Sequence, residues 1–325
     1  MANKGKIFMT GASGFIGSYM AEKFLEKGYK LAILLRQTNR LNYPAVQRLL
    51  KNYDIDVYYG TITDRHYMDF AMKDFQPDYV IHLGAITPVA YSFDHPVEVF
   101  ETNANGTINL AESARRNCPH LKKFIFSSSM ETYGYNPKRE PVVETDEQMP
   151  GAPYGVAKVA AEKYLKMMNF AYGFPSICFR QTNCYGRREN DYFVVEAIVT
   201  KMLKNPETIN LGAGDPTRNF IWIDDLVDLW VAAIESENPE ILGESFNTGP
   251  ANGITIQELA DICAEKLDWR GDIKWNTMPR RPGELSYLNS NCDKAKKLLE
   301  WEPKVGLSEG LDRVIKIWKE NLNVN

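Results

Sequence analysis

The stretch K-I-F-M-T-G-A-S-G-F-I-G, residues 6–17, reads as a buried strand, a glycine turn and the start of a helix. Apolar side chains recur at helical spacing through residues 15–27. Gly11, Gly14 and Gly17 have no side chains, so a pyrophosphate can approach the backbone, and the helix N-terminus supplies partial positive charge. The stretch therefore predicts a dinucleotide site at the first strand–helix junction. The alternative is ordinary turn chemistry.

Further short apolar runs follow at regular intervals, with helical stretches between them. This alternation predicts an α/β fold with a parallel, doubly wound Rossmann sheet, whose ligands lie beyond the carboxyl ends of the strands. After Arg180 the pattern loosens and predicts a smaller C-terminal α/β region that binds the substrate. We expect domains at residues 1–180 and 181–325, interleaved by a return of the chain around 220–250. The predicted strands are 6–10, 30–35, 56–60, 78–84, 122–126 and 175–180.

Arg36 follows the second predicted strand, about 20 residues beyond the glycine turn. An NAD site usually has an acidic residue there for the ribose hydroxyls. A guanidinium suits a 2′-phosphate instead, and Arg40 is nearby. The sequence therefore favours NADP, with NAD beside a solvated arginine as the alternative.

Tyr154 and Lys158 stand four residues apart in P-Y-G-V-A-K, so on a helix they project from one face. A nearby cation favours the phenolate, which lets the phenol exchange a proton near neutral pH. The serine run 127–129 ends an apolar strand and offers a hydroxyl to hold a substrate alcohol. Since Tyr-x-x-x-Lys alone arises often by chance, the pair gains weight from the upstream glycine turn.

Composition narrows the function classes. The chain has 325 residues, a formal net charge of −4 and 44% hydrophobic residues, which indicates a globular protein and disfavours nucleic-acid or membrane partners. Five scattered cysteines without Cys-x-x-Cys spacing fit a reducing compartment. Four histidines form no ligand-like cluster, so we expect no metal. No targeting segment or membrane span is visible, and a cytoplasmic location is the expectation.

Several motifs, in order along the chain, resemble the extended short-chain dehydrogenase/reductases that modify nucleotide-activated sugars. The glycine turn, the serine run before Tyr133-Gly134, and Y-G-V-A-K carry this resemblance. It extends over nearly the whole chain. The further matches are H-L-G-A (82–85), T-N-A-N-G-T (102–107), R-Q-T-N-C-Y-G (180–186), R-N-F-I-W-I-D-D (218–225) and R-P-G-E (281–284).

The resemblance implies roles for individual residues. Lys158 is expected on the nicotinamide ribose and Ser129 on the sugar oxygen. The implied cofactor-binding residues are Gly11, Ser13, Gly14, Phe15, Ile16, Gly17, Arg36, Thr61, Ile62, Leu83, Gly84, Ala85, Asn103, Ser127, Tyr154 and Lys158. The implied substrate-binding residues are Thr87, Ser129, Met130, Asn183, Arg187, Arg218 and Arg281.

Two stretches depart from the family pattern. The third strand usually ends Gly-Asp, but here Gly60 is followed by Thr61, so the adenine loses that carboxylate. The family's Tyr-Gly-Pro is replaced by Tyr185-Gly186-Arg187, which changes the loop and offers an arginine to the nucleotide.

Glu131 suggests which reaction follows oxidation at C4 of the sugar. The stretch Ser129–Gly134 resembles the Thr-Ser-Glu-x-Tyr-Gly of GDP-mannose 4,6-dehydratases. A carboxylate there can abstract the acidified C5 proton and drive loss of the C6 hydroxyl. The catalytic residues implied are Ser129, Glu131, Tyr154 and Lys158. Because Met130 replaces the acid of dTDP-glucose dehydratases, Glu131 must also protonate the departing hydroxyl.

Other outcomes remain open at this stage. A glutamate here also occurs in UDP-glucuronate decarboxylases and in proteins grouped with 4-epimerases, so 4-epimerisation, decarboxylation and reduction of a keto sugar are alternatives. A non-catalytic cofactor-binding protein on the same fold is a different class. The resemblance also implies a homodimer, or a tetramer, through helices at 97–116 and 154–172. The apolar residues offered for that contact are Val99, Leu110, Val159 and Leu165, with burial in the core as the alternative.

Overall fold

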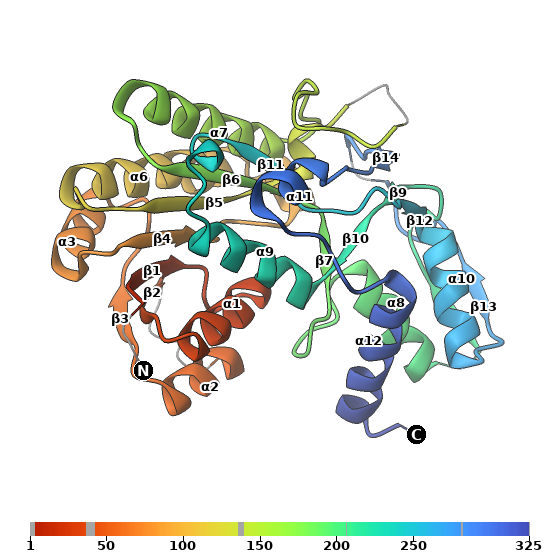
Figure 1. Cartoon of the computed structure of the whole chain (residues 1–325). Helices are drawn as coiled ribbons and strands as arrows, with labels where there is room; N and C mark the ends of the chain where they lie inside the picture. Colours follow the sequence, from red (N-terminus) through yellow and green to blue (C-terminus); the bar gives the residue numbers. More distant parts are fainter. Residues whose placement is uncertain (1–3, 37–42, 136–139, 206, 281, 325) are drawn as a thin grey trace.

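The computed structural model describes residues 4–36, 43–135, 140–205, 207–280 and 282–324. A seven-stranded parallel sheet in the order β11-β6-β5-β4-β1-β2-β3 forms its centre, which confirms the predicted doubly wound fold (Figure 1). The strands are apolar along their length because helices bury both faces. Their bounds are β1 Lys6–Thr10, β2 Lys30–Leu35, β3 Asp56–Tyr59, β4 Tyr79–His82, β5 Lys123–Ser129, β6 Ser176–Gln181 and β11 Ser245–Asn247.

Two helical layers cover the sheet (Figure 1). One contains α1 Phe15–Glu26, α2 Pro44–Asn52 and α9 Ile223–Glu235, which pack on alternate strand residues such as Ile7 and Ile125. The other contains α3 Arg65–Phe75, α6 Gly106–Asn117 and α7 Pro153–Tyr172, which pack on the intervening residues such as Phe8 and Phe124. Strand residues thus alternate between two cores, as the pleat requires.

Three of the differences between the structure and the sequence prediction affect the large sheet and its helices most. β5 extends through Ser129 because its serines stay paired with β6 up to Gln181. The helix predicted at 97–116 is interrupted, since α5 Pro96–Phe100 and α6 are joined by a π-helical segment, Glu101–Asn105. β11 was not predicted as a strand, because three residues carry no readable periodicity.

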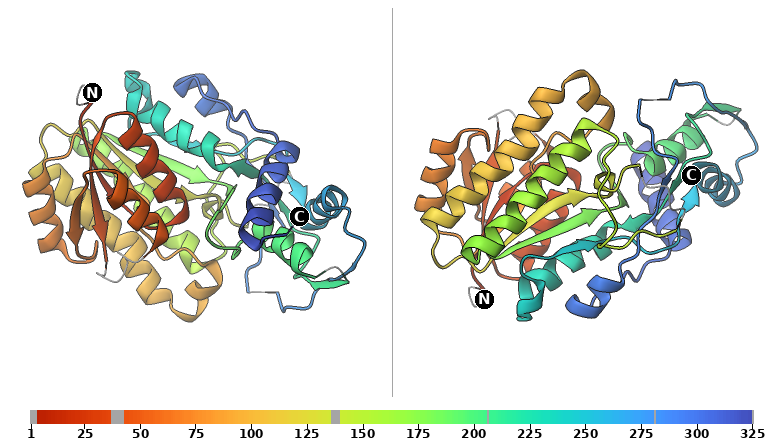
Figure 2. Two further views of the ribbon diagram at one scale, coloured as in Figure 1. Left: turned by 90° about the horizontal axis from the view of Figure 1, so that it is seen from below. Right: turned by 90° about the horizontal axis from the view of Figure 1, so that it is seen from above.

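The C-terminal region lies at one end of the sheet, where both views of Figure 2 bring its green and blue segments together. Helix α10 begins at Ile256, because Thr255 and Glu258 form a capping box just before it. The region's helices are α8 Val194–Lys204, α10 Ile256–Leu267 and α12 Leu307–Leu322. Its paired strands are β7 Asn183–Tyr185 with β10 Phe220–Trp222, β8 Thr208–Asn210 with β13 Asp272–Lys274, and β9 Thr217–Arg218 with β12 Ile254–Thr255 and β14 Tyr287–Leu288.

The chain crosses back between these two parts. Helix α9 packs against α1, and β11 pairs with β6 in the large sheet. Helices α4 Val89–Asp94 and α11 Asp293–Leu299 complete the described α-helices. We propose that the chain divides into two domains near residue 180, as the sequence predicts. The segment from α9 to β11 then belongs to the dinucleotide-binding domain, although it follows residue 180. Within the described residues, no helix is long and apolar enough to cross a membrane.

Candidate active site

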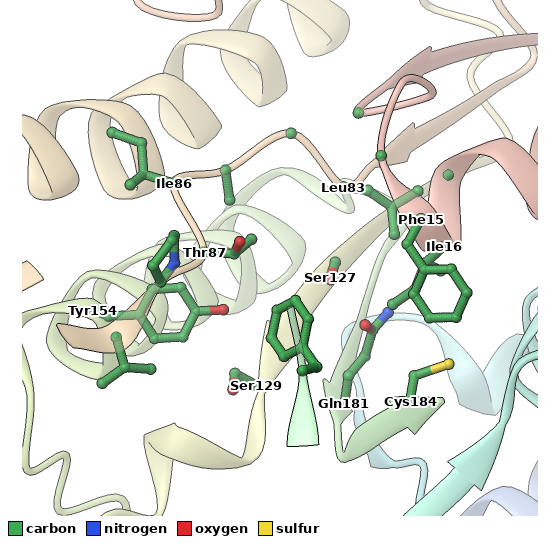
Figure 3. A pocket seen from close by; sticks show the side chains of 18 of the residues that line it. Phe15, Ile16, Leu83, Ile86, Thr87, Ser127, Ser129, Tyr154, Gln181 and Cys184 are labelled. Carbon is green, nitrogen blue, oxygen red and sulfur yellow. The ribbon is translucent and has the colours of Figure 1, made fainter. Parts of the chain in front are cut away.

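A cavity of about 670 Å³ opens at the carboxyl ends of the parallel strands, where a doubly wound sheet binds its ligands (Figure 3). Residues from all three predicted groups line it together. Those that line it are Gly11, Ser13, Gly14, Phe15, Ile16, Gly17, Arg36, Thr61, Ile62, Leu83, Gly84, Ala85, Thr87, Ser127, Ser129, Met130, Glu131, Tyr154, Lys158, Asn183 and Arg187.

The glycine turn is built for close approach of a ligand to the backbone. Gly11 has φ +79°, a conformation that side-chain-bearing residues rarely adopt. A Cβ on Gly17 would lie 2.1 Å from the carbonyl oxygen of Gly11, so α1 can pack against the turn only with glycine there. The amide of Gly14 donates to Gly11 O at 2.9 Å, just before α1 begins at Phe15. This cradle at a helix N-terminus fits a pyrophosphate.

Tyr154 and Lys158 lie in the first two turns of α7, as the spacing predicts. Lys158 Nζ donates to the carbonyl oxygen of Ser127 at 2.7 Å and lies 5.8 Å from the centre of the Tyr154 ring. Burial lowers the pKa of Lys158 to about 7, and the Glu162 carboxylate opposes this effect. The hydrogen bond to Ser127 O positions the amine of Lys158 in the cavity lining.

The environment of Tyr154 differs from the sequence expectation. Burial raises the pKa of the phenol, the hydrogen bond with Ser129 lowers it, and the charge of Glu131 raises it. Desolvation thus outweighs the neighbouring groups in this structure. The side chains of Tyr154 and Ser129 nevertheless line the same cavity, from α7 and the end of β5 (Figure 3).

Met130 and Glu131 lie in a 3₁₀ turn that follows β5 directly, Met130–Thr132. The Ser129 hydroxyl accepts the amide of Glu131 at 3.2 Å and caps this turn. Glu131 lines the cavity, whereas Met130 also packs into a small apolar cluster with Tyr133. One carboxylate and one thioether therefore stand where dTDP-glucose dehydratases are expected to have two acids.

A buried polar network lies behind the serine loop, on the α7 side of the sheet. Arg180 donates to Glu162 at 2.9 Å and to the Tyr133 hydroxyl at 2.8 Å, and Ser128 donates to Glu162. The Tyr133 hydroxyl donates to Asn247 Oδ1 at 2.7 Å. These bonds join β5, β6, β11 and α7, so they hold the strand ends that carry Ser129.

Arg187 is held by its own neighbours. Its guanidinium lies between the rings of Phe15 and Phe193, at 4.2 and 3.8 Å, and donates to Cys184 O and Glu196. Glu196 is fully buried and also accepts the amides of residues 186 and 187. Arg187 therefore shapes the cavity wall next to the glycine turn, and its bonds restrict how far it can move toward a ligand.

Two predicted residues that the structure describes, Asn103 and Arg218, do not line the cavity. Asn103 is buried behind it and bonds both Ile86 N and Ile86 O, which fixes the loop after β4. Arg218 is buried and donates to Thr217 O and Leu285 O, both at 2.8 Å. Arg281, like Arg40, lies outside the described residues.

Several cavity residues were not singled out from the sequence. Gln181 and Thr182 belong to the R-Q-T-N motif, which was noted as a whole, so the signal was present. Ile86, Phe193 and Glu196 carried no sequence signal, since only the fold brings α8 and the loop after β4 to this place. Among the described residues, no group of three or more His, Cys, Asp or Glu could hold a metal ion.

The glycine cradle, the Tyr154–Lys158 pair and the seven-stranded sheet define an extended short-chain dehydrogenase/reductase. The family model described as GDP-mannose 4,6 dehydratase matches residues 8–314. The chain thus belongs to the nucleotide-sugar epimerase/dehydratase family of these proteins.

Similar proteins include both reaction types. The crystal structure of UDP-glucose 4-epimerase from Thermotoga maritima with UDP-glucose is 31% identical, with TM-score 0.86 over 98% of this chain and 99% of that one. The UDP-glucuronic acid 4-epimerase of Bacillus cereus, in complex with UDP-glucuronic acid and NAD, is 26% identical, with TM-score 0.86 over 97% and 99%. Human dTDP-D-glucose 4,6-dehydratase is 26% identical over 98% of this chain and 91% of that one.

Proposed function

We propose that the protein is a nucleotide-sugar 4,6-dehydratase that oxidises C4 of an NDP-hexose, eliminates water across C5 and C6, and returns the hydride to C6. The observation that carries this proposal is the position of Glu131. Its carboxylate lines the same cavity as Ser129 and Tyr154 and acts electrostatically on the phenol. A second proton-transferring group beside the oxidation centre is what dehydration requires and simple epimerisation does not.

Each residue of the site has a separate role in the proposed reaction. A bound nicotinamide dinucleotide would accept the hydride from C4 and later deliver it to C6. As the phenolate, Tyr154 takes the proton of the C4 hydroxyl, which Ser129 holds by a hydrogen bond. Glu131 then removes the C5 proton and gives a proton to the departing C6 hydroxyl, which leaves as water. After hydride has returned to C6, a proton that exchanges with solvent adds at C5 and completes the 6-deoxy-4-keto product. Tyr133 and Arg180 keep Ser129 in place from behind.

A 4-epimerase is the second candidate, and the comparisons favour it. The UDP-glucose 4-epimerase of Thermotoga maritima is more similar in sequence than the human dehydratase, at 31% against 26% identity. The apolar Met130 also removes the separate acid used by dTDP-glucose dehydratases. Decarboxylation and keto-sugar reduction have less support. A non-catalytic binding protein has least, because Ser129, Tyr154 and Lys158 all line one cavity.

Turnover in heavy water separates the two reactions. The purified protein would be incubated in heavy water with either NAD or NADP and with UDP-, GDP-, CDP- or dTDP-hexoses in turn. Mass spectrometry would then give the mass of each product. We expect one donor to lose water without added reductant and to carry solvent deuterium at C5. An epimer of unchanged mass that carries no deuterium would contradict dehydration and support the second candidate.

Arg36 leads us to propose NADP as the preferred cofactor. Its exposed side chain follows β2 and lines the cavity, where a guanidinium can bind a 2′-phosphate. The alternative, NAD, is supported by the NAD complexes of similar epimerases.

We expect R36A to weaken NADP binding by about 10-fold or more and to change NAD binding little, since hydrogen bonds to charged groups contribute roughly 1.5–3 kcal/mol. Calorimetry with each dinucleotide would measure the two affinities. R270A, at an exposed distant arginine, is the control; equal loss with NAD would contradict the assignment.

We propose that Asn183, Thr87 and Arg187 line the part of the cavity that binds the diphosphate of the nucleotide sugar. Asn183 begins β7, is exposed to the cavity and donates to Asn219 O at 3.2 Å. Arg218 is proposed to act indirectly, because its guanidinium ties β9 to the loop at Leu285. The base stays open, although UDP-sugars are the first donors to test given the similar structures with UDP-glucose and UDP-glucuronic acid.

We propose that a homodimer forms through α5 and α7, which pack together. Val99, Leu110 and Leu165 are fully buried within the chain, so they belong to its own core and not to a partner surface. Exposed apolar residues on α5 and α7 include Val97, Phe100 and Val156, of which Phe100 and Val156 line a shallow groove with prolines. A monomer mass by light scattering at micromolar concentration would contradict the dimer.

A further inference from the structure

Gln181 has a buried donor with no partner in the described structure. It is the last residue of β6, and its side chain extends into the cavity (Figure 3). The carboxamide nitrogen Nε2 is shielded from solvent and forms no hydrogen bond. A buried unsatisfied donor costs roughly 1–3 kcal/mol, so its presence in a binding cavity indicates a ligand acceptor.

Strand register explains why this amide faces the cavity. β5 and β6 run parallel, with Ser128 opposite Arg180 and Ser129 opposite Gln181. Successive side chains point to opposite faces. Ser128 and Arg180 both meet Glu162 on the α7 side, so Ser129 and Gln181 point to the other face, at the strand ends. Gln181 is thus a direct neighbour of the serine proposed to hold the sugar hydroxyl.

The sheet order indicates which ligand end reaches Gln181. The pyrophosphate cradle is at the end of β1, and Arg36 and Ile62 follow β2 and β3 on one side of it. An adenosine bound on that side leaves the nicotinamide half to extend over β4, β5 and β6 on the other. Gln181 ends the sixth strand, at the far edge of that path. This step depends on the proposed function, since it takes a nicotinamide dinucleotide as the cofactor.

We propose that Gln181 Nε2 donates a hydrogen bond to the carboxamide oxygen of the nicotinamide and thereby fixes the rotation of the ring against the Ser129–Tyr154 pair. The carboxamide is the polar group at that end of the dinucleotide that needs a donor. Phe15, Ile16, Leu83 and Cys184 line the cavity with mostly apolar atoms, whereas Gln181 offers an amide donor without a partner. The sugar hydroxyl at C4 already has Ser129 and Tyr154.

Comparing a dinucleotide with its fragment tests this contact. Q181M keeps a long unbranched side chain and removes both polar atoms. Its affinity would be measured by calorimetry for whichever of NAD and NADP the wild-type protein binds more tightly, and for the matching ADP-ribose or its 2′-phosphate, which lack the nicotinamide. We expect about 10-fold weaker binding of the dinucleotide and unchanged binding of the fragment.

Each other outcome identifies a different failure. Unchanged dinucleotide binding overturns the contact. Equally weakened binding of the dinucleotide and of the fragment also overturns the contact, because the substitution then acts on the adenosine half or on the fold. Unchanged binding of the fragment by Q181M shows that the variant is folded. Weaker binding of the nucleotide sugar alone reassigns Gln181 to the substrate and overturns the proposal. If the wild-type protein binds neither NAD nor NADP, the proposed function itself fails.

Discussion

Replacing Tyr154 with phenylalanine is expected to lower kcat by about 10²–10⁴-fold, the range for loss of a positioned general acid–base group. The change removes only the phenolic oxygen that would take the C4 proton and that lines the cavity beside Ser129. The ring still fills its buried position at the start of α7. Steady-state turnover of the donor found by mass spectrometry would measure the effect, and binding of the dinucleotide and the nucleotide sugar should change little.

Tyr133 provides a matched control for this prediction. It is also a buried tyrosine near the end of β5, but its hydroxyl bonds Arg180 and Asn247 and does not line the cavity. Y133F is expected to lower stability by roughly 2–3 kcal/mol, because it removes two buried hydrogen bonds, one of them to the charged Arg180. Its loss of kcat should be far smaller than that of Y154F, because the Tyr133 hydroxyl only supports Ser129 from outside the cavity. A Y154F protein that keeps more than a tenth of the wild-type kcat would rule out Tyr154 as the proton-transferring group.

The parts of the site that sequence could predict depend on local geometry. The glycine turn follows from three residues without side chains between a strand and a helix, and the Tyr154–Lys158 pair follows from helical spacing alone. Both line the cavity where a doubly wound sheet opens. Short-range rules suffice here because each feature lies within one strand–helix unit.

The parts that were missed depend on register between distant strands. Gln181 faces the cavity only because it pairs with Ser129, 52 positions earlier, and nothing in R-Q-T-N alone says which of its side chains turn inward. Arg187 lines the cavity as expected, but the bonds that Glu196 and two aromatic rings make with its guanidinium could not be predicted from sequence. The phenol's raised pKa likewise comes from burial, which a sequence does not display.

The largest stability effect is expected from Arg180→Met. Arg180 and Glu162 are both about 95% buried and paired at 2.9 Å, so removing the guanidinium leaves a carboxylate in the interior. Breaking such a pair costs roughly 3–5 kcal/mol, because the remaining charge keeps its desolvation penalty and loses its partner. Urea-induced unfolding followed by circular dichroism would measure the change in the free energy of unfolding.

The double variant R180M/E162M should recover much of that loss, because apolar residues of similar volume carry no desolvation penalty. Arg270 is the matched control, since its side chain is 87% exposed in its pair with Asp268, and R270M should change stability by no more than about 0.5 kcal/mol. If R180M costs no more than R270M, or if the double variant loses as much as both single changes summed, then Arg180 and Glu162 do not stabilise the fold as a coupled pair. Recovery of stability without recovery of turnover would indicate that the pair serves mainly to hold Ser128, and through it Ser129, at the end of β5.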